Sequence, residues 1–154
     1  MADATDRFRA SAPDDLAIDV RRHPAGTRTA ADAATAIGCD VAQIVKSLVF
    51  MADDRAALVL TSGANRVDTA AVARLLGADT VGKADADQVR AATGYAIGGT
   101  PPFGHTAPMP TLIDRDLLDH ATVWAAAGTP DSVFPLDPQR LVTLTGGRVA
   151  DVAE

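Results

Sequence analysis

The strongest pattern of apolar positions along the chain lies in residues 43–51. Six of the nine residues there are apolar, and β-branched and aromatic residues are among them, which predicts a buried β-strand. Alternate residues of a strand share a face, so Ile44, Lys46, Leu48 and Phe50 are expected on one side of it. An ammonium group on an apolar face is costly to bury unless it reaches water, a carboxylate or a ligand phosphate. Lys46 is therefore a candidate functional residue; the alternative is a strand-end lysine whose amine extends into solvent.

The rest of the chain alternates between short predicted strands and short predicted helices. Residues 1–15 fit a short helix or a frayed arm, residues 21–28 fit a loop, and residues 53–55 fit the tip of a hairpin. Capping residues at both ends mark the predicted helices, which cover residues 29–38, 68–77, 85–94 and 137–146, with a short turn at 40–43. The predicted strands cover residues 16–20, 57–61, 95–97, 111–114, 122–125 and 132–134, with a short extended piece at Val81.

These elements predict an α/β (α+β) fold, with a mixed, barrel-like β-sheet flanked by short helices. No repeat, low-complexity segment or linker interrupts the pattern. We therefore expect a single domain over residues 1–154, which is long enough to bury a hydrophobic core.

Composition narrows the range of functions. Apolar residues make up 47% of the chain and charged residues 22%, which is ordinary for a globular protein. The net charge of −6 argues against a protein that coats nucleic acid non-specifically, although a local basic patch could still bind one end of an RNA. Lysine occurs only at Lys46 and Lys83 among 14 Lys and Arg residues, so the lysine at position 46 indicates a need for a compact point charge.

The chain carries one cysteine, Cys39, which excludes an internal disulfide and fits a reducing cytoplasm. No apolar run approaches the length of a membrane span, and the N-terminal residues are polar. These features predict a cytoplasmic protein without membrane association.

A second candidate site is the glycine- and proline-rich segment of residues 94–105. Paired glycines after a predicted strand let the backbone approach a ligand closely and can direct N–H groups at an oxygen atom. The two prolines that follow stiffen the segment. The alternative is a rigid turn with no role in binding, because glycine and proline are common turn residues. The segment is not a nucleotide-binding motif, since both the G-x-G-x-x-G pattern and a Walker lysine are absent from it.

The sequence offers few candidate nucleophiles or metal ligands. Cys39 fits a small packing residue better than a reactive thiol. The histidines are scattered singly without metal-ligand spacing, so no metal and no cofactor are expected. His23 and His105 fall on predicted loops, where either could line a pocket. Asp114 ends an apolar strand shortly after the glycine segment and is the acid expected near a site.

Four segments together resemble the YbaK/EbsC family of aminoacyl-tRNA deacylases, which is also found as the editing insertion of bacterial prolyl-tRNA synthetases. The resemblance covers roughly residues 16–152, and it depends on the combination of the lysine strand with the glycine–proline segment. It implies a mixed-sheet fold whose site lies in a cleft between the sheet and helices. The matching segments are residues 43–50, 62–68, 93–105 and 111–114.

The resemblance also implies roles for individual residues. Lys46 is similar to the family lysine that contacts the 3′-terminal nucleotide. Gly98 and Gly99 are similar to the loop that places backbone N–H groups around the aminoacyl carbonyl, so these three residues are the expected catalytic residues. The expected substrate-binding residues are His23, Thr29, Ser62, Thr100, Pro101, Phe103, His105 and Asp114.

The expected function is that of a trans-editing hydrolase that removes a small wrong amino acid from a mischarged tRNA, most often the tRNA for proline. The expected partners are the 3′ acceptor end of that tRNA and prolyl-tRNA synthetase. The family uses positioned water or groups of the substrate itself, which agrees with the missing nucleophile. Family members differ in the amino acid they remove, and the sequence leaves that identity open. The alternative is a non-catalytic tRNA- or nucleotide-binding module with the same fold.

Overall fold

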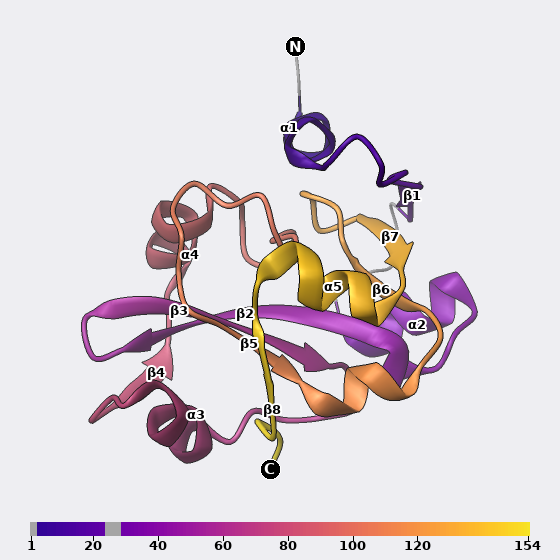
Figure 1. Ribbon diagram of the computed structural model, residues 1–154. Coiled ribbons are helices and arrows are strands. Elements are labelled where there is room, and N and C mark those ends of the chain that lie inside the picture. The colour runs from indigo at the N-terminus through magenta and orange to yellow at the C-terminus, as the bar shows by residue number, and fades with distance from the viewer. Residues whose placement is uncertain (1–2, 24–28) are drawn as a thin grey trace.

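The computed structural model describes residues 3–23 and 29–154, and Figure 1 shows their arrangement around one mixed β-sheet. In that view α1, α4 and α5 lie above the β2–β3 hairpin and α3 lies below it. The helices are α1 (Ala4–Ser11), α2 (Ala30–Ile37), α3 (Thr69–Leu76), α4 (Ala86–Thr93) and α5 (Pro138–Thr145), with short 3-10 turns η1 (Val41–Gln43) and η2 (Arg115–Asp119). The strands are β1 (Arg21–Arg22), β2 (Ile44–Ala52), β3 (Arg55–Ser62), β4 (Val81–Lys83), β5 (Thr111–Asp114), β6 (Val123–Ala126), β7 (Ser132–Leu136) and β8 (Arg148–Ala150).

The sheet has the strand order β1-β7-β6-β2-β3-β5-β8, and β4 also pairs with β2. Strands β2 and β3 form the central antiparallel hairpin, whereas β6 runs parallel to β2 and β5 runs parallel to β3. Both β6 and β4 lie on the edge of β2 that faces away from β3. Strand β6 pairs only with Ile44 and Val45, and β4 pairs only from Phe50 to Ala52. Among the described residues, no strand therefore lies beside the middle of β2 on this edge.

Apolar side chains cover both faces of the sheet. On one face, Val45 and Val49 of β2 belong to the main core, together with Phe8 of α1 and Leu141 of α5. The opposite face carries two smaller clusters. Ile44 packs in a cluster with residues of α2, and Phe50 packs in a cluster with residues of α3. Lys46 projects from this second face, between the two clusters.

The helix ends follow the capping pattern that the sequence predicts. The Thr29 side chain accepts a hydrogen bond from the Asp32 amide, and Gly38 ends α2 in the left-handed region at φ +86°. Asp68, Asp85 and Asp137 cap α3, α4 and α5 in the same way, and the glycines that close these helices also have positive φ. The predicted α+β fold and these helices are confirmed.

Two predicted strands are wrong. Residues 16–20 form no strand, and the short strand β1 comes immediately after them and pairs with β7. The apolar alternation there arises because Leu16, Ile18 and Val20 pack against the main core from an extended segment. Residues 95–97 form a turn after α4, in which Tyr95 is buried and Ile97 is 56% exposed. Strand β8 was not predicted, because its three residues follow two glycines without an alternating pattern.

Residues 24–28 of the predicted loop lie outside the described residues. Within residues 3–23 and 29–154, no helix is long and apolar enough to span a membrane.

Candidate functional site

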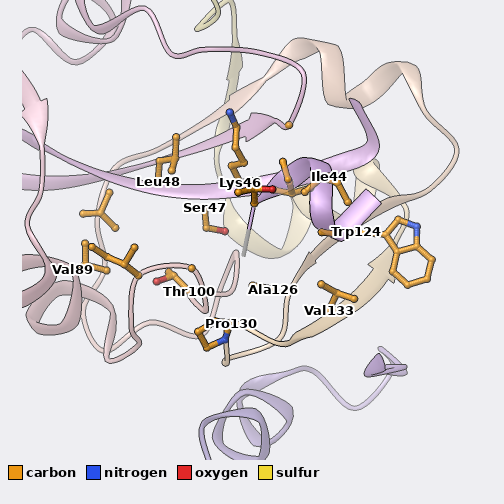
Figure 2. A pocket seen from close by; sticks show the side chains of 18 of the residues that line it. Ile44, Lys46, Ser47, Leu48, Val89, Thr100, Trp124, Ala126, Pro130 and Val133 are labelled. Atoms are coloured by element: carbon orange, nitrogen blue, oxygen red, sulfur yellow. The ribbon is translucent and has the colours of Figure 1, made fainter. Parts of the chain in front are cut away.

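A cavity of about 620 Å³ opens at the uncovered middle of β2. Every residue from Ile44 to Val49 lines it, although successive residues of a strand point to opposite faces of the sheet. The cavity therefore wraps around the edge of β2. Its other walls come from the start of α2, the end of β4, the loop after α4, and strands β6 and β7. Figure 2 shows this arrangement, with Lys46 and Ser47 on opposite sides of the β2 ribbon.

The Lys46 ammonium group is held by backbone rather than by a carboxylate. Its Nζ atom donates a hydrogen bond to the Asn65 carbonyl oxygen over 2.6 Å. Partial burial lowers the pKa of Lys46; the nearby positive charges of Lys83 and Arg66 also lower it, and the Asp114 carboxylate opposes the shift. A lysine with two other cations nearby is a favourable place for an anion, because a bound phosphate would stabilise the charged form.

Asp114 positions the group that holds Lys46. It is 2% exposed, and its carboxylate accepts hydrogen bonds from the Ser62 amide at 3.0 Å and the Asn65 side-chain nitrogen at 2.8 Å. These bonds fix the turn after β3, so that the Asn65 carbonyl faces Lys46. Asp114 itself does not line the cavity. The structure thus places this acid behind Lys46, where it orients the turn without reaching the cavity.

Lys83 is the second cation of the cavity. It lies at the end of β4 opposite Phe50, so it projects from the same face of the sheet as Lys46. Both lysines of the chain therefore line one cavity, in a protein with a net charge of −6. The sequence contains a signal for this pairing, since lysine is confined to these two positions, but strand pairing was needed to bring them together.

The two glycines of the loop after α4 differ in their surroundings. Gly98 lines the cavity with φ at +85°, and no partner of its amide is found among the described residues. The Gly99 amide, in contrast, donates to the Ala96 carbonyl oxygen at 3.0 Å. A Cβ atom on Gly99 would lie only 2.8 Å from the Thr129 carbonyl carbon. Of the two glycine amides, the one without a partner among the described residues is therefore that of Gly98, whereas Gly99 allows close packing.

The remaining predicted residues of this loop separate into two groups. Thr100 lines the cavity, and its hydroxyl donates to the Ala96 carbonyl oxygen at 3.1 Å. Pro101, Phe103 and His105 do not line it. The Phe103 ring packs 4.9 Å from the Phe8 ring in the main core. The His105 Nε2 atom donates to the Pro101 carbonyl oxygen over 2.6 Å, and burial lowers the pKa of His105.

Three further predicted residues lie around the cavity or behind it. Thr29 lines the cavity where α2 begins. His23 is half-buried beside β7, and its Nε2 atom is buried with no hydrogen-bond partner among residues 3–23 and 29–154. Ser62 is buried behind the cavity wall, where its hydroxyl donates to the Ala42 carbonyl oxygen at 2.8 Å.

Sequence reasoning missed several lining residues. Trp124 and Val133 join the cavity wall from β6 and β7, and Arg21 stacks over the Trp124 ring at 4.9 Å. Ser47 also lines the cavity, next to Lys46. Within residues 3–23 and 29–154, no three His, Cys, Asp or Glu residues gather in a way that could hold a metal ion.

Comparison with known proteins identifies the family. The model of the aminoacyl-tRNA editing domain matches residues 24–144.

The chain belongs to the aminoacyl-tRNA editing domain family.

Relatives of this editing domain occur both inside synthetases and as separate proteins. A proline–tRNA ligase of Lactobacillus helveticus is 28% identical over 134 residues, which is 87% of this chain and 24% of the ligase. This chain therefore spans about a quarter of that ligase. The Enterococcus faecalis protein EbsC, named as a candidate Cys-tRNA(Pro)/Cys-tRNA(Cys) deacylase, is 25% identical over 80% of this chain and 76% of its own.

A solved structure resembles the editing domain over its whole length. It is described as a candidate trans-editing enzyme for prolyl-tRNA synthetase and is 43% identical, with a TM-score of 0.90, over 100% of this chain and 99% of that one. The resemblance to the YbaK/EbsC family is confirmed, as is the prediction of an aminoacyl-tRNA editing enzyme at the level of the family.

Proposed function

We propose that this editing domain acts in trans, as a hydrolase that releases a small wrong amino acid from mischarged tRNA for proline. The proposal rests on one observation: Lys46, Lys83 and Gly98, whose amide has no partner among the described residues, all line the same cavity. Two cations suit the phosphate and sugar of a 3′-terminal nucleotide, and an unpaired N–H suits the oxygen of an ester carbonyl.

The size and lining of the cavity fit such a substrate. A volume of about 620 Å³ lies within the usual range for small-molecule sites and can hold a terminal nucleoside with a short side chain. The wall on the Ser47 side consists of small or branched residues, including Val45, Val49 and Ala126. We therefore propose that the amino acid removed has a small side chain.

The proposed reaction is hydrolysis of the ester bond. Lys46 and Lys83 hold the terminal nucleotide, the Gly98 amide stabilises negative charge that develops on the carbonyl oxygen, and a water molecule adds to the carbonyl carbon. The bond from that carbon to the ribose oxygen then breaks, leaving the free amino acid and a tRNA with its ribose hydroxyl restored. An aminoacyl ester is already activated, so orientation and charge stabilisation are sufficient without a strong base.

A deacylation panel tests this function directly. The purified protein is mixed with tRNA for proline that carries Cys, Ala, Ser, Thr or 2-aminobutyrate, and correctly charged prolyl-tRNA serves as the control. We expect rapid release of at least one small amino acid and no acceleration with prolyl-tRNA. Failure to accelerate release from every mischarged tRNA would contradict the proposal. Tight tRNA binding without release would favour the non-catalytic binding module instead.

A further inference from the structure

Within residues 3–23 and 29–154, one edge of β2 is unpaired between the short stretches that pair with β6 and β4. Strand β6 ends its pairing at Val45, and β4 begins its pairing at Phe50. Between them, the described residues place no strand beside β2, and the cavity fills this gap. An exposed strand edge presents unpaired backbone N–H and C=O groups, which can pair with another chain or with a ligand of similar shape.

The backbone of Ser47 faces this gap. The Ile44 carbonyl oxygen accepts from the Gly63 amide, so Ile44, Lys46 and Leu48 direct their backbone groups toward β3. The Val49 carbonyl oxygen accepts from the Ala84 amide on the opposite edge. Ser47 lies two residues before Val49, and its N–H and C=O therefore point to that same edge, at the point where no described strand pairs with it.

The Ser47 side chain adds a second unpaired polar group. Its Oγ atom is buried and has no hydrogen-bond partner among the described residues. Other hydroxyls of the cavity wall are already engaged, because Thr100 donates to Ala96 and Ser132 bonds with Thr129. A buried hydroxyl without a partner is unfavourable in the free protein and is satisfied when a polar ligand or water binds beside it.

We infer that the aminoacyl group of the substrate docks on Ser47 as a single residue of an added β-strand. An aminoacyl ester carries a nitrogen donor and a carbonyl acceptor on either side of one α-carbon, as a strand residue does. In an antiparallel pair, two facing residues exchange both backbone hydrogen bonds. The Ser47 N–H would donate to the ester carbonyl, and the Ser47 carbonyl would accept from the α-amino group. This inference rests on the proposed function and specifies how its substrate is held.

This docking also fixes where the rest of the substrate lies. Facing residues in a sheet place their side chains on the same face, so the substrate side chain would lie beside Ser47 Oγ, next to Thr100 and Val89. The nucleotide would then occupy the opposite face, where Lys46 and Lys83 project. The substrate thus straddles the edge of β2, as the cavity does.

Amide hydrogen exchange measured by NMR tests the inference. In the free protein, we expect the Ser47 amide to exchange rapidly, because it has no partner, whereas the Lys46 and Leu48 amides, which bond to β3, are protected. The probe is 3′-deoxy-3′-(L-alanylamino)adenosine 5′-phosphate, which cannot be hydrolysed as an ester. At saturation we expect Ser47 exchange to slow at least tenfold while Leu48 changes little. A Ser47 amide that is protected without the probe, or unaffected by it, would overturn the docking.

Two matched changes sharpen this test. A probe whose α-amino group is replaced by hydrogen should bind at least tenfold more weakly, because the Ser47 carbonyl loses its donor. Ser47→Pro removes the N–H that faces the gap together with the hydroxyl, but no bond to β3, so we expect a folded protein whose deacylation rate falls at least a hundredfold. Ser47→Ala keeps that N–H and should lose less than tenfold. A folded Ser47→Pro protein with the wild-type rate would contradict the docking.

The outcomes separate this inference from the proposed function. Deacylation of mischarged tRNA together with an unchanged Ser47 amide would refute the docking and leave the function standing. No deacylation and no probe binding would refute both. Should Ser47→Pro fail to fold, the exchange measurement and the probe lacking its amine still decide the question.

Discussion

The resemblance to the editing family depends on the combination of the lysine strand with the glycine–proline segment, and these two segments contribute to the cavity in different ways. Every residue of β2 from Ile44 to Val49 lines the cavity, on both faces of the strand. The loop from Gly94 to His105 contributes only Ile97, Gly98 and Thr100, and its second half packs into the core. The difference shows that one recognisable motif can combine residues that line a cavity with residues that pack in the core.

If the second half of the loop only packs in the core, changes there should reduce stability and leave the deacylation rate nearly unchanged. Phe103→Ala removes a ring that is 7% exposed and packs on Phe8 and Phe134, so we expect the free energy of unfolding to fall by about 3–5 kcal/mol. Denaturant unfolding measures this loss. Single-turnover deacylation at a temperature where the variant is folded should proceed close to the wild-type rate. A large fall in the deacylation rate of the folded variant would place Phe103 in the site.

Changes in β2 should instead slow the reaction and leave stability nearly unchanged. Lys46→Ala removes the ammonium that faces the cavity, and we expect the rate of deacylation to fall about 100-fold, as for the loss of one group that stabilises developing charge. Lys46→Arg should also be impaired, because a planar guanidinium does not replace a compact ammonium at the same position.

Thermal unfolding provides the control for the lysine variants. Lys46 is partly buried without a carboxylate partner in hydrogen-bond contact, so its removal should leave the melting temperature nearly unchanged. A wild-type rate in Lys46→Ala would remove this residue from the site. A large fall in melting temperature would show that its bond to Asn65 has a structural role.

Gly98 and Gly99 are adjacent, but Gly98 lines the cavity and Gly99 packs against the Thr129 backbone, so they test whether the two roles can be separated. Gly99→Ala places a Cβ atom against the Thr129 backbone, and we expect a loss of about 1–3 kcal/mol in the free energy of unfolding with little change in rate. Gly98→Ala adds a methyl group at a residue that lines the cavity and has φ at +85°, where the nearest described atom is Pro130 Cβ at 3.9 Å. It should slow the reaction more, besides the cost in stability of a side chain at positive φ. Equal effects of the two substitutions on the rate would contradict the assignment of Gly98 to the site and of Gly99 to packing.

The smallest expected effect concerns His105 and pH. Burial lowers the pKa of His105, so the unfolded chain binds its proton more readily than the folded chain does. Stability should therefore decline as the pH falls below about 6.5, the ordinary value for histidine, and level off below the lowered pKa of the folded state. Melting temperatures measured between pH 7 and pH 5 for the wild type and His105→Gln would show this. An identical decline in both proteins would assign the acid sensitivity to other groups.

Local sequence determined much of this protein. The caps of α2, α3, α4 and α5 could be predicted, because capping depends on residues within one helical turn. The strand around Lys46 could be predicted from its own apolar, β-branched and aromatic composition. The resemblance to a known family then indicated the fold, although it did not distinguish the lining residues of the glycine loop from the packing ones.

Tertiary structure alone decided the shape of the site. Lys83 joins Lys46 because β4 pairs with β2, and Asp114 reaches Asn65 because β5 pairs with β3. The gap beside Ser47 exists because β6 and β4 cover only the two ends of one strand edge. Such pairings join residues that are far apart in the chain, and no local pattern specifies where one partner strand stops and the next begins. The sequence therefore identified the lysine strand, whereas the pairing of distant strands decided which of its backbone groups stay free.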